Sequence, residues 1–573
     1  MASADLLDVL VVGAGPTGLT LATALARAGV RCRIIDAAPQ PAAESRALAI
    51  HAGTLQAMER LGLAEAILAR GIAAPGVKIH VDGANLDIPF DRLPSRYAFI
   101  LTLPQSDTEG LLIGRLTAAG VVVERPVSFV DLLDDGDAVT ATLRIGDRQE
   151  RVRARWLVAC DGAGSRVRHV LGLPFVGRAY DETFWLADVR VRWPYASDVL
   201  HIFLGAHGLL FTAPLPGERQ RIIVTPRHTA AVQSRGEGLR LADVQALVDE
   251  AAPGTRLDDP AWLSTFHVSR RVVPRFRVGR VFLAGDAAHV HSPAGGQGMN
   301  TGIQDAENLA WKLALVVRGA ADPSLLDSYH AERYPVARGV VRVTDRLTRA
   351  ALLHAPLLRA ARNLVMRVLL RRPSVQRRIA LRLSELAIAY RDSPVILPAR
   401  GRAVRHGIAP GRRFPDVTVR AGDTRTRLFE MVGSDQHTVL ILTGTADVAA
   451  ATRLATELCE RYPRRLHAYV VRSGSAAPHA ASDSNVLHDA DGRLARTGGD
   501  VLYIVRPDGY VGARAAPPSA RVVADYFARL ATPARGVSLR ARRLGRIAVA
   551  TAVVALTAVV VARRRRALGR VVP

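Results

Sequence analysis

A glycine-rich hexapeptide near the start of the sequence has the residue types and the spacing that bind a phosphate ester. It reads Gly13-Ala14-Gly15-Pro16-Thr17-Gly18. Gly13 permits a tight turn, Gly15 lets the backbone approach a pyrophosphate, and Gly18 allows a helix to pack closely on a strand. The hexapeptide therefore predicts a site for a dinucleotide, which can be FAD or NAD.

The flanking residues supply the elements that this chemistry needs. Apolar strands are expected over Leu6–Val12 and Val30–Ile35, and a helix of small residues is expected over Thr17–Ala28. The N-terminus of that helix offers free N–H groups to phosphates. Asp36 ends the second strand, where its carboxylate can accept hydrogen bonds from ribose hydroxyls.

A second constellation combines a carboxylate, a glycine loop and a helix. Gly285-Asp286 follows an apolar strand, and the loop over residues 293–300 precedes a helix expected over Thr301–Arg318. This order suits a ring or a phosphoester held against bare backbone, with helix-end N–H groups facing negative charge. A third piece, Cys160-Asp161-Gly162, follows a strand at Trp156–Ala159. The candidate cofactor-binding residues of these pieces are Asp161, Gly285, Asp286, Pro293, Gly296, Gly298, Met299 and Asn300.

Together these motifs resemble those of the para-hydroxybenzoate-hydroxylase-like, single-component FAD monooxygenases, over about residues 6–395. Gly285-Asp286 matches the family's GD signature and Asp161-Gly162 its DG signature. Ser45-Arg46-Ala47 resembles the segment whose Arg reaches the FAD phosphates, and Leu103-Pro104-Gln105 resembles the segment whose Gln touches the ribityl region. One departure is Ser292, because relatives often have Pro at that position.

The resemblance also implies roles for these residues. Asp36 would bind the adenosine ribose, and Asp286 would bind the pyrophosphate–ribityl portion of FAD. The backbone of Gly298–Asn300 would face the pyrimidine edge of the flavin, and Pro293 would lie beside the isoalloxazine. The motif of Asp161 is associated with the handling of FAD and of the nicotinamide cofactor.

The implied activity is that of an FAD-dependent monooxygenase. NAD(P)H would reduce FAD, O2 would add at flavin C4a, and the resulting hydroperoxide would hydroxylate an aromatic or polyketide-like substrate. A base would help by removing the proton of a phenol. His201, His207, His267 and Tyr180 fall in the strand-rich region expected to cover the flavin, but a packing or surface role is the favoured interpretation for each of them. The sequence therefore identifies no catalytic base.

Three other interpretations share parts of this pattern. Flavin halogenases are expected to have a tunnel lysine and a WxWxI motif. This sequence has only Lys78 and Lys312 as lysines and contains no WxW, so a halogenase is excluded. An FAD-dependent reductase of the geranylgeranyl-reductase type remains open, although such reductases usually lack a thioredoxin-like domain. A non-catalytic, membrane-tethered flavoprotein also remains open, although three intact FAD motifs argue against it.

The length of 573 residues and the composition, with 49% hydrophobic and 23% charged residues, exclude a disordered or collagen-like protein. Three separated cysteines without a CxxC exclude a disulfide scaffold and a thiolate metal site, and no metal is expected. The net charge is +25, of which residues 341–390 carry +9 and residues 531–573 carry +10. The remainder is nearly balanced, so no nucleic-acid surface is indicated.

The expected fold is α/β. Residues 1–395 would form a Rossmann-like FAD-binding core, in which an inserted antiparallel sheet, over about 75–100 and 180–275, covers the substrate. Strands of this sheet are expected over Glu182–Trp193, His201–Phe211 and Arg219–Thr225. Basic helices are expected over about 327–390, with breaks near Pro356 and Pro373. Residues 396–530 resemble the thioredoxin-like domain of larger family members. This domain lacks a CxxC, so we expect a structural role for it.

The tail over residues 531–573 contains an apolar segment at 547–562 with arginines on both sides. Its sixteen residues are slightly fewer than the roughly 20 of a spanning helix, but snorkelling arginines extend its reach. We expect a C-terminal transmembrane helix, although a helix docked on the protein would also explain the segment. No signal peptide is visible, so the catalytic part is expected in the cytoplasm, and the arginine clusters are expected to meet anionic lipid headgroups.

Overall fold

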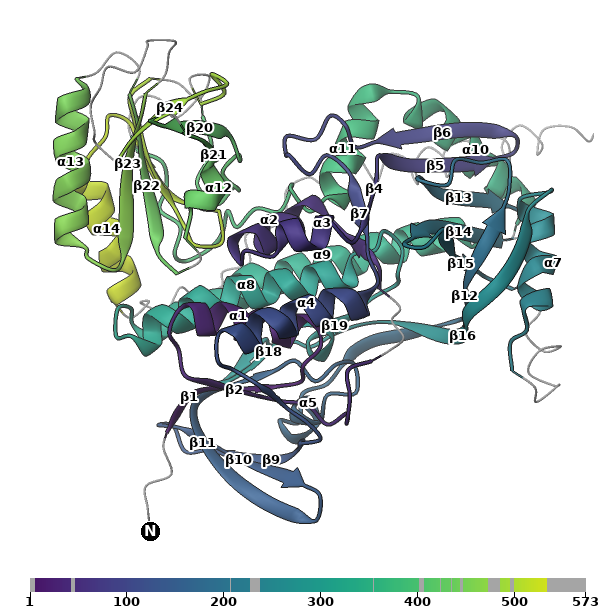
Figure 1. Ribbon diagram of the computed structural model, residues 1–573, viewed down its shortest axis with the longest axis horizontal. Helices are drawn as coiled ribbons and strands as arrows, with labels where there is room; N and C mark the ends of the chain where they lie inside the picture. Colours follow the sequence, from purple (N-terminus) through teal and green to yellow (C-terminus); the bar gives the residue numbers. More distant parts are fainter. Residues whose placement is uncertain are drawn as a thin grey trace, which may run out of the picture.

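The computed structural model describes residues 6–532, except for residues 43–46, 207, 227–237, 354, 401–406, 423, 434, 444–446, 473–484 and 495–498. Figure 1 shows three parts: a central sheet with its helices, a second sheet to the right, and a third sheet, coloured green to yellow, at the upper left. The segment 547–562 and Arg46 lie outside the described residues. No helix among the residues that are described is long and apolar enough to cross a membrane.

The central sheet carries the N-terminal motif. Strands β1, β2, β8, β11 and β18 run parallel, and the order across the sheet is β17-β18-β11-β1-β2-β8, with β10 and β9 continuing from β11. Its strands are β1 (Leu7–Val12), β2 (Cys32–Ile35), β8 (Val123–Glu124), β9 (Ser128–Asp134), β10 (Val139–Ile145), β11 (Arg148–Ala159), β17 (Arg277–Val278) and β18 (Val281–Leu283). The near-continuous apolar run of β1 is typical of a parallel strand buried on both faces.

Helices pack on this sheet close to the expected positions. The helix expected over Thr17–Ala28 is α1 (Pro16–Arg27), and it packs against α8 (Gly298–Val317). The other helices of this part are α2 (Ala52–Arg60), α3 (Ala64–Leu68), α4 (Gln105–Ala118) and α5 (Arg166–Val170). A small sheet of β3 (Ala49–Ile50), β7 (Ile100–Thr102) and β4 (Ile72–Ala74) lies next to them.

The second sheet has the order β19-β16-β12-β15-β14-β13-β5-β6. Its strands are β5 (Gly76–Val81), β6 (Ala84–Pro89), β12 (Val176–Arg192), β13 (Leu200–Gly205), β14 (Gly208–Leu215), β15 (Arg219–Val224), β16 (Arg256–Val272) and β19 (His289–Val290). The single strand expected over His201–Phe211 was wrong, because β13 and β14 form an antiparallel pair there. Gly208, with a φ of +108°, permits the reversal that a strand residue with a side chain would resist.

Helix α7 (Leu241–Ala251) covers one face of the second sheet, where Trp185 and Phe203 pack. Phe184, Leu186 and Phe266 pack in a separate cluster on the other face, together with Leu352 from the helical region. The two faces therefore have different partners, as expected for a sheet inserted between a covering helix and the body of the protein.

The basic helical region divides at the expected prolines. It consists of α9 (Asp327–Ala351), α10 (Pro356–Leu370) and α11 (Pro373–Leu383), preceded by the 3-10 helix η2 (Pro323–Leu326). Pro356 and Pro373 are the first residues of their helices, where the missing N–H costs no hydrogen bond. Pro335 lies inside α9 without ending it.

The third sheet is mixed and has the order β21-β20-β24-β23-β22-β25-β26. Its strands are β20 (Thr418–Ala421), β21 (Thr424–Arg427), β22 (His437–Thr443), β23 (Leu466–Arg472), β24 (Val486–Asp489), β25 (Val501–Val505) and β26 (Val511–Ala515). Its helices are α12 (Leu428–Met431), α13 (Val448–Arg461) and α14 (Ala520–Ala531). Cys459, on α13, is a half-buried free thiol.

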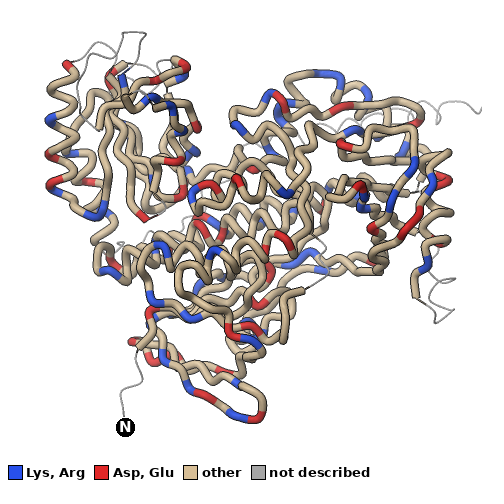
Figure 2. Tube along the Cα trace, in the orientation of Figure 1, with Lys and Arg blue, Asp and Glu red and all other residues tan. Residues whose placement is uncertain are grey.

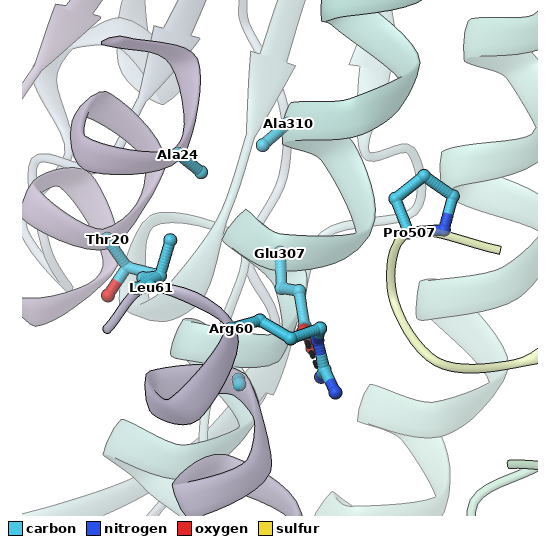
Figure 3. Close-up of a pocket in the computed structure, with 8 residues that line it drawn as sticks. Thr20, Ala24, Arg60, Leu61, Glu307, Ala310 and Pro507 are labelled. Atoms are coloured by element: carbon cyan, nitrogen blue, oxygen red, sulfur yellow. Dashed lines mark hydrogen bonds and ion pairs between the residues drawn. The ribbon is translucent and has the colours of Figure 1, made fainter. Parts of the chain in front are cut away.

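A buried ion network joins this C-terminal part to α8 and α9. Arg506 donates to both carboxylate oxygens of Glu332, at 2.6 and 2.9 Å, and Lys312 donates to the same carboxylate at 2.8 Å. These side chains are 0% exposed. Next to them, Arg60 and Glu307 point toward one another, with Pro507 of the C-terminal part nearby (Figure 3). Helix α8 is therefore fixed to the C-terminal part along its second half.

Candidate active site

The three sequence motifs lie at the carboxyl ends of three neighbouring parallel strands. β11 pairs with β1 on one side, with Val12 opposite Ala159, and with β18 on the other, with Ala159 opposite Leu283. The loops that follow these strands carry Gly13, Asp161 and Gly285, so adjacent parallel strands bring them together. Ligands of open α/β sheets bind at this edge.

The glycine loop has the close backbone packing that its sequence predicts. A Cβ on Gly13, whose φ is +102°, would lie 2.3 Å from the carbonyl oxygen of Cys160. A Cβ on Gly18 would lie 1.9 Å from the carbonyl oxygen of Gly13. By contrast, no protein atom lies within 4 Å of the Cβ position of Gly15. Only this last glycine leaves open space, as an approaching pyrophosphate requires.

Thr17 joins the first glycine loop to the second constellation. Its hydroxyl oxygen lies 2.5 Å from the Cβ position of Gly285 and 2.3 Å from that of Gly302, so both glycines are needed for α1 to approach α8. Pro16 is the first residue of α1, and the free N–H groups that follow it face the edge of the sheet.

Asp36 lies beside the glycine loop, and a partner that sequence reasoning missed binds it. Its carboxylate accepts from the N–H of Ala14 at 2.7 Å and from that of Ala38 at 2.9 Å. Arg125, the residue after β8, donates to it at 2.9 Å. No sequence motif points to Arg125, which reaches Asp36 only because β8 lies next to β2.

Two further carboxylates have properties suited to a ligand site. Asp286 has an exposed side chain. Desolvation by the protein around it raises the pKa of its carboxyl, and the electrostatic effect of His289 opposes this rise. Burial also raises the pKa of Asp161, whose Oδ2 accepts from the N–H of Val167 at 3.2 Å. Oδ1 of Asp161 is buried and has no hydrogen-bond partner among the described residues. Such an atom is typical of a site whose ligand completes the hydrogen bonds.

Asn300 fixes the second glycine loop to the strand β3. Its side chain accepts from the N–H of His51 at 2.8 Å and donates to the carbonyl oxygens of Ala49 and Gly296 at 2.8 and 2.7 Å. His51 in turn contacts the carbonyl oxygen of Gly295 at 2.8 Å. The loop from Pro293 to Gly298 is thus held open at the N-terminus of α8, beside Met299.

Asp305 fixes the loop that contains Asp286. It accepts from the N–H of Gly285 at 3.1 Å and from Nε of Arg333 at 2.6 Å, and it pairs with Nε2 of His289 at 2.8 Å. Although burial opposes ionisation, Arg333 and His289 hold the pKa of Asp305 below its usual range. The carboxylate therefore stays charged and keeps the loop in place.

Gln105 begins α4, and its backbone N–H donates to the carbonyl oxygen of Ala47 at 3.1 Å. Its side-chain amide donates to Glu109 at 2.8 Å. This places Gln105 beside the segment that contains Arg46. The structure thus brings Gln105 to the same region as the glycine loops, while the prediction for Arg46 stays untested.

Of the histidines considered as a base, His201 is buried on the α7 face of the second sheet. It pairs with Nε2 of His80 at 2.9 Å and with the carbonyl oxygen of Ala196 at 2.8 Å. His201 is therefore a packing residue, and His207 lies outside the described residues.

Tyr180 belongs to a chain of hydroxyl groups that begins at the second glycine loop. Ser292 and Thr348 lie 2.5 Å apart between their hydroxyl oxygens. Thr348 lies near Tyr180, and Tyr180 donates to Asp345 at 2.9 Å. The chain connects the loop of Pro293 with a carboxylate near the surface, which also binds Arg270 at 2.8 Å.

Glu385, which follows α11, lies buried against α8 and is expected to make stability pH-dependent. It contacts Thr301 and Gln304, and burial raises its pKa from 4.5 to about 8. Between pH 4.5 and about 8, Glu385 is ionised in the unfolded chain and neutral in the folded chain. The free energy of unfolding therefore falls as the pH rises through this range. Glu385→Gln should match the wild type near pH 5 and exceed it near pH 8 by a few kcal/mol.

Urea unfolding of both proteins at the two pH values measures this difference. Glu150→Gln is a suitable control. Glu150 forms an ion pair with Arg33, which lowers the pKa of the Glu150 carboxyl, so this carboxyl makes the free energy of unfolding rise with pH instead of fall. An identical pH dependence in wild type and Glu385→Gln would contradict a protonated Glu385.

The geometry fits FAD by its open space and its free polar groups. Gly15 leaves room for a pyrophosphate, Asp161 presents an unpaired oxygen, and Asp286 is accessible. The N-terminus of α8 places its N–H groups and its positive dipole end at the same edge of the sheet.

Comparisons with known proteins agree with this geometry. Residues 6–344 match the family model described as FAD binding domain, and residues 408–534 match that of aromatic-ring hydroxylase, C-terminal. The chain is 39% identical to 6-methylpretetramide 4-monooxygenase of Streptomyces rimosus, over 89% of this chain and 91% of that protein. It is 35% identical to pentachlorophenol 4-monooxygenase of Sphingobium chlorophenolicum, over 88% and 93% of the two chains.

Among solved structures, the chain is similar to OxyS anhydrotetracycline hydroxylase from Streptomyces rimosus. The TM-score is 0.73 at 30% identity, and the match covers 91% of this chain and 98% of that one. The match includes both the FAD-binding part and the C-terminal part. With its FAD-binding residues at one edge of the sheet and relatives of nearly the same length, the chain belongs to the family of FAD-dependent aromatic-ring monooxygenases.

Proposed function

We propose that this monooxygenase hydroxylates an aromatic or polyketide-like substrate with NAD(P)H and O2. The observation that carries the proposal is the convergence of three FAD motifs at adjacent strand ends, with open space at Gly15. Relatives named for 6-methylpretetramide, pentachlorophenol and anhydrotetracycline support this substrate class. A reductase of the geranylgeranyl type is not favoured, because these relatives are named monooxygenases or hydroxylases.

The proposed FAD site uses the residues expected from the sequence. The loop of Gly13–Gly18 and the N-terminus of α1 would hold the pyrophosphate, Asp36 the adenosine ribose, and Asp286 the pyrophosphate–ribityl portion. Arg46 and Gln105 would complete this half of the site. The backbone at Gly298–Asn300 would face the pyrimidine edge of the flavin, with Pro293 and Gly296 beside the ring. When bound, FAD supplies the redox chemistry that activates O2.

The proposed substrate space lies between this site and the inner face of the second sheet. Phe184, Leu186 and Phe266 make that face apolar, as an aromatic substrate and the exclusion of water require. Arg221 also lies on this sheet, and Asp188 neutralises it through contacts at 2.7 and 2.6 Å. We propose residues 1–395 as the catalytic core, with the sheet over about 75–100 and 180–275 as the substrate cover, and 396–530 as a structural domain.

We further propose that the hydroxyl chain from Ser292 carries protons away from the site. The Ser292 oxygen accepts from the N–H of Ala294 at 3.2 Å, and it shares a hydrogen bond with the Thr348 hydroxyl at 2.5 Å, in which either can donate. Thr348 lies near Tyr180, which donates to Asp345, whose carboxylate can receive a proton. The chain thus leads from the glycine loop toward solvent.

Thr348→Val interrupts this hydroxyl chain at nearly constant volume. We expect turnover to fall about 100-fold, at the lower end of general acid–base effects, and to become more dependent on pH. Flavin content and thermal stability should hardly change. Thr344→Val is the control, because Thr344 lies one turn earlier on α9 and donates only to carbonyl oxygens of its own helix. Equal pH profiles for the two variants would contradict the proton path.

Asp286→Ala is expected to abolish retention of FAD, because the variant removes a carboxylate that is accessible at the strand end. The flavin absorbance of the purified protein, relative to its protein absorbance, measures the loss. Asp135→Ala is the control, since Asp135 lies on a surface turn and pairs there with Arg153. A fully flavinated Asp286→Ala protein would show that this carboxylate does not hold the cofactor.

The overall activity is tested by NAD(P)H consumption under oxygen, with and without candidate phenols. A hydroxylase consumes NAD(P)H faster with its substrate and forms a product heavier by one oxygen atom. A reductase would instead form a product heavier by hydrogen, without oxygen uptake. Failure of the protein to bind FAD after reconstitution would contradict the hydroxylase, the reductase and the tethered flavoprotein alike.

We propose in addition that the segment 547–562 anchors the protein in a membrane, with the catalytic part in the cytoplasm, where NAD(P)H is available. Its uncharged length and the arginines on both sides support this. Fractionation of the full-length protein after an alkaline wash is the test, next to a version that ends near Thr532. If the full-length protein remains in the supernatant, the anchor is wrong.

A further inference from the structure

Helix α10 exposes a row of large apolar side chains in addition to those that it packs on the protein body. Leu357, Leu364 and Val368 are 85%, 64% and 49% exposed, and their spacing places them on one side of the helix. Leu358 lies next to them and is 46% exposed. A surface helix normally directs such residues to the core, so this side of α10 lacks a partner among the described residues.

The side of α10 that faces the protein body combines apolar residues, Met366 and Leu370, with polar ones. Asn363 donates to the Asp82 carboxylate at 2.5 Å, and Arg367 donates to the carbonyl oxygen of Asp82 at 2.6 Å. Arg362 donates to the carbonyl oxygen of Ala350 at 2.8 Å and so caps the end of α9. These contacts fix the rotation of α10, and the apolar side cannot turn inward without breaking them.

The exposed apolar residues continue onto α9 through Val343 and Leu347. Six of the nine large apolar side chains that are exposed in the described part of the chain lie between residues 343 and 368. This concentration on two consecutive helices, α9 and α10, differs from the scatter of single residues that any protein shows.

The surroundings of this surface are basic. Exposed arginines lie on α9 and at the two ends of α11, namely Arg342, Arg346, Arg349, Arg371, Arg372, Arg377, Arg378 and Arg382. Both acids of the stretch 341–390 are occupied, because Asp345 binds Tyr180 and Arg270, and Glu385 is buried. Over most of the described chain, basic and acidic residues are interspersed instead (Figure 2).

We propose that the outer face of α10, with Val343 and Leu347 of α9, docks on an anionic lipid surface. The apolar side chains would enter the boundary between headgroups and acyl chains, and the surrounding arginines would meet lipid phosphates. A second copy of the chain fits less well, since a two-fold interface would place each basic patch against itself. The proposal rests on α9 and α10 alone, so it can fail or hold independently of the anchor at 547–562 and of the proposed reaction.

The test places a tryptophan on the proposed face of the full-length, FAD-loaded protein. Leu364→Trp is compared with Val122→Trp, which replaces a side chain that is 66% exposed elsewhere on the protein. Both proteins are mixed with vesicles of phosphatidylglycerol and phosphatidylcholine that carry brominated acyl chains, which quench tryptophan on contact. Leu357→Trp serves as a second position on the same face, and flavin absorbance verifies that each variant is folded.

We expect about twofold quenching of the added tryptophan at position 364, and none at position 122. In the Leu364→Trp protein, Arg371→Gln with Arg372→Gln should raise the lipid concentration for half-maximal quenching about thirtyfold, at about 1 kcal/mol for each charge. Absence of quenching at 364 and 357, or equal quenching at 122, would overturn the proposal. Emission that shifts with protein concentration before lipid is added would overturn it in favour of a second copy.

Discussion

Replacing Glu332 with Gln is expected to lower the free energy of unfolding by about 3–5 kcal/mol, since it leaves two buried cations, Arg506 and Lys312, with the single carboxylate of Asp508. Arg506 and Lys312 both bind this carboxylate, and all three side chains are 0% exposed. Although burial opposes ionisation, Arg506 and Lys312 hold the pKa of Glu332 well below its usual range. The carboxylate is therefore charged at neutral pH.

Urea unfolding followed by circular dichroism measures this loss, and flavin fluorescence reports the state of the FAD-binding part in the same samples. Arg400→Gln is the control. Its partner is Asp525 at 2.6 Å, but the two side chains are 48% and 37% exposed, so the loss should stay below about 1 kcal/mol. A similarly small loss in Glu332→Gln would mean that the network does not stabilise the attachment of the C-terminal part.

Replacing Gly15 with Ala is expected to leave the fold intact and to weaken FAD binding about 100-fold. The backbone of Gly15, at φ −78° and ψ −177°, is one that any residue adopts, and no protein atom lies near its Cβ position. The added methyl group therefore meets nothing in the protein. It would meet the pyrophosphate, and displacing bound groups by about 1 Å is enough for a loss of this size.

Titration of the apoprotein with FAD, followed by flavin fluorescence, measures the affinity, and thermal unfolding without FAD measures the fold. Gly18→Ala is the matched comparison, because its Cβ would lie 1.9 Å from the carbonyl oxygen of Gly13. That variant should be destabilised by about 1–3 kcal/mol even without FAD. Unchanged FAD affinity in Gly15→Ala would place the pyrophosphate elsewhere.

Local patterns in the sequence were sufficient for the elements that carry the glycine motifs. The helix expected over Thr17–Ala28 is α1, and the breaks expected near Pro356 and Pro373 are the starts of two helices. In each case neighbouring residues alone set the conformation, by apolar period or by the missing N–H of proline. The strand expected over His201–Phe211 failed, because its alternation continued through a reversal at Gly208.

The partners of the site residues could not be predicted in the same way. Arg125 reaches Asp36, Arg333 reaches Asp305, and Thr348 reaches Ser292. Each pair joins residues from separate elements, and none has a motif or a spacing that marks it. Only the order of the strands and the packing of α9 on α8 bring them within hydrogen-bond distance.

The sequence by itself determined the cofactor class and the positions of the three FAD motifs, because a tight turn, close helix packing and a phosphate-facing backbone each require glycine at a set place. It also located the excess positive charge, but not what that charge surrounds. The tertiary structure alone decided that α10 directs Leu357 and Leu364 outward. That rotation depends on Asn363 and Arg367 meeting Asp82, almost three hundred residues away, and no local pattern encodes such a contact.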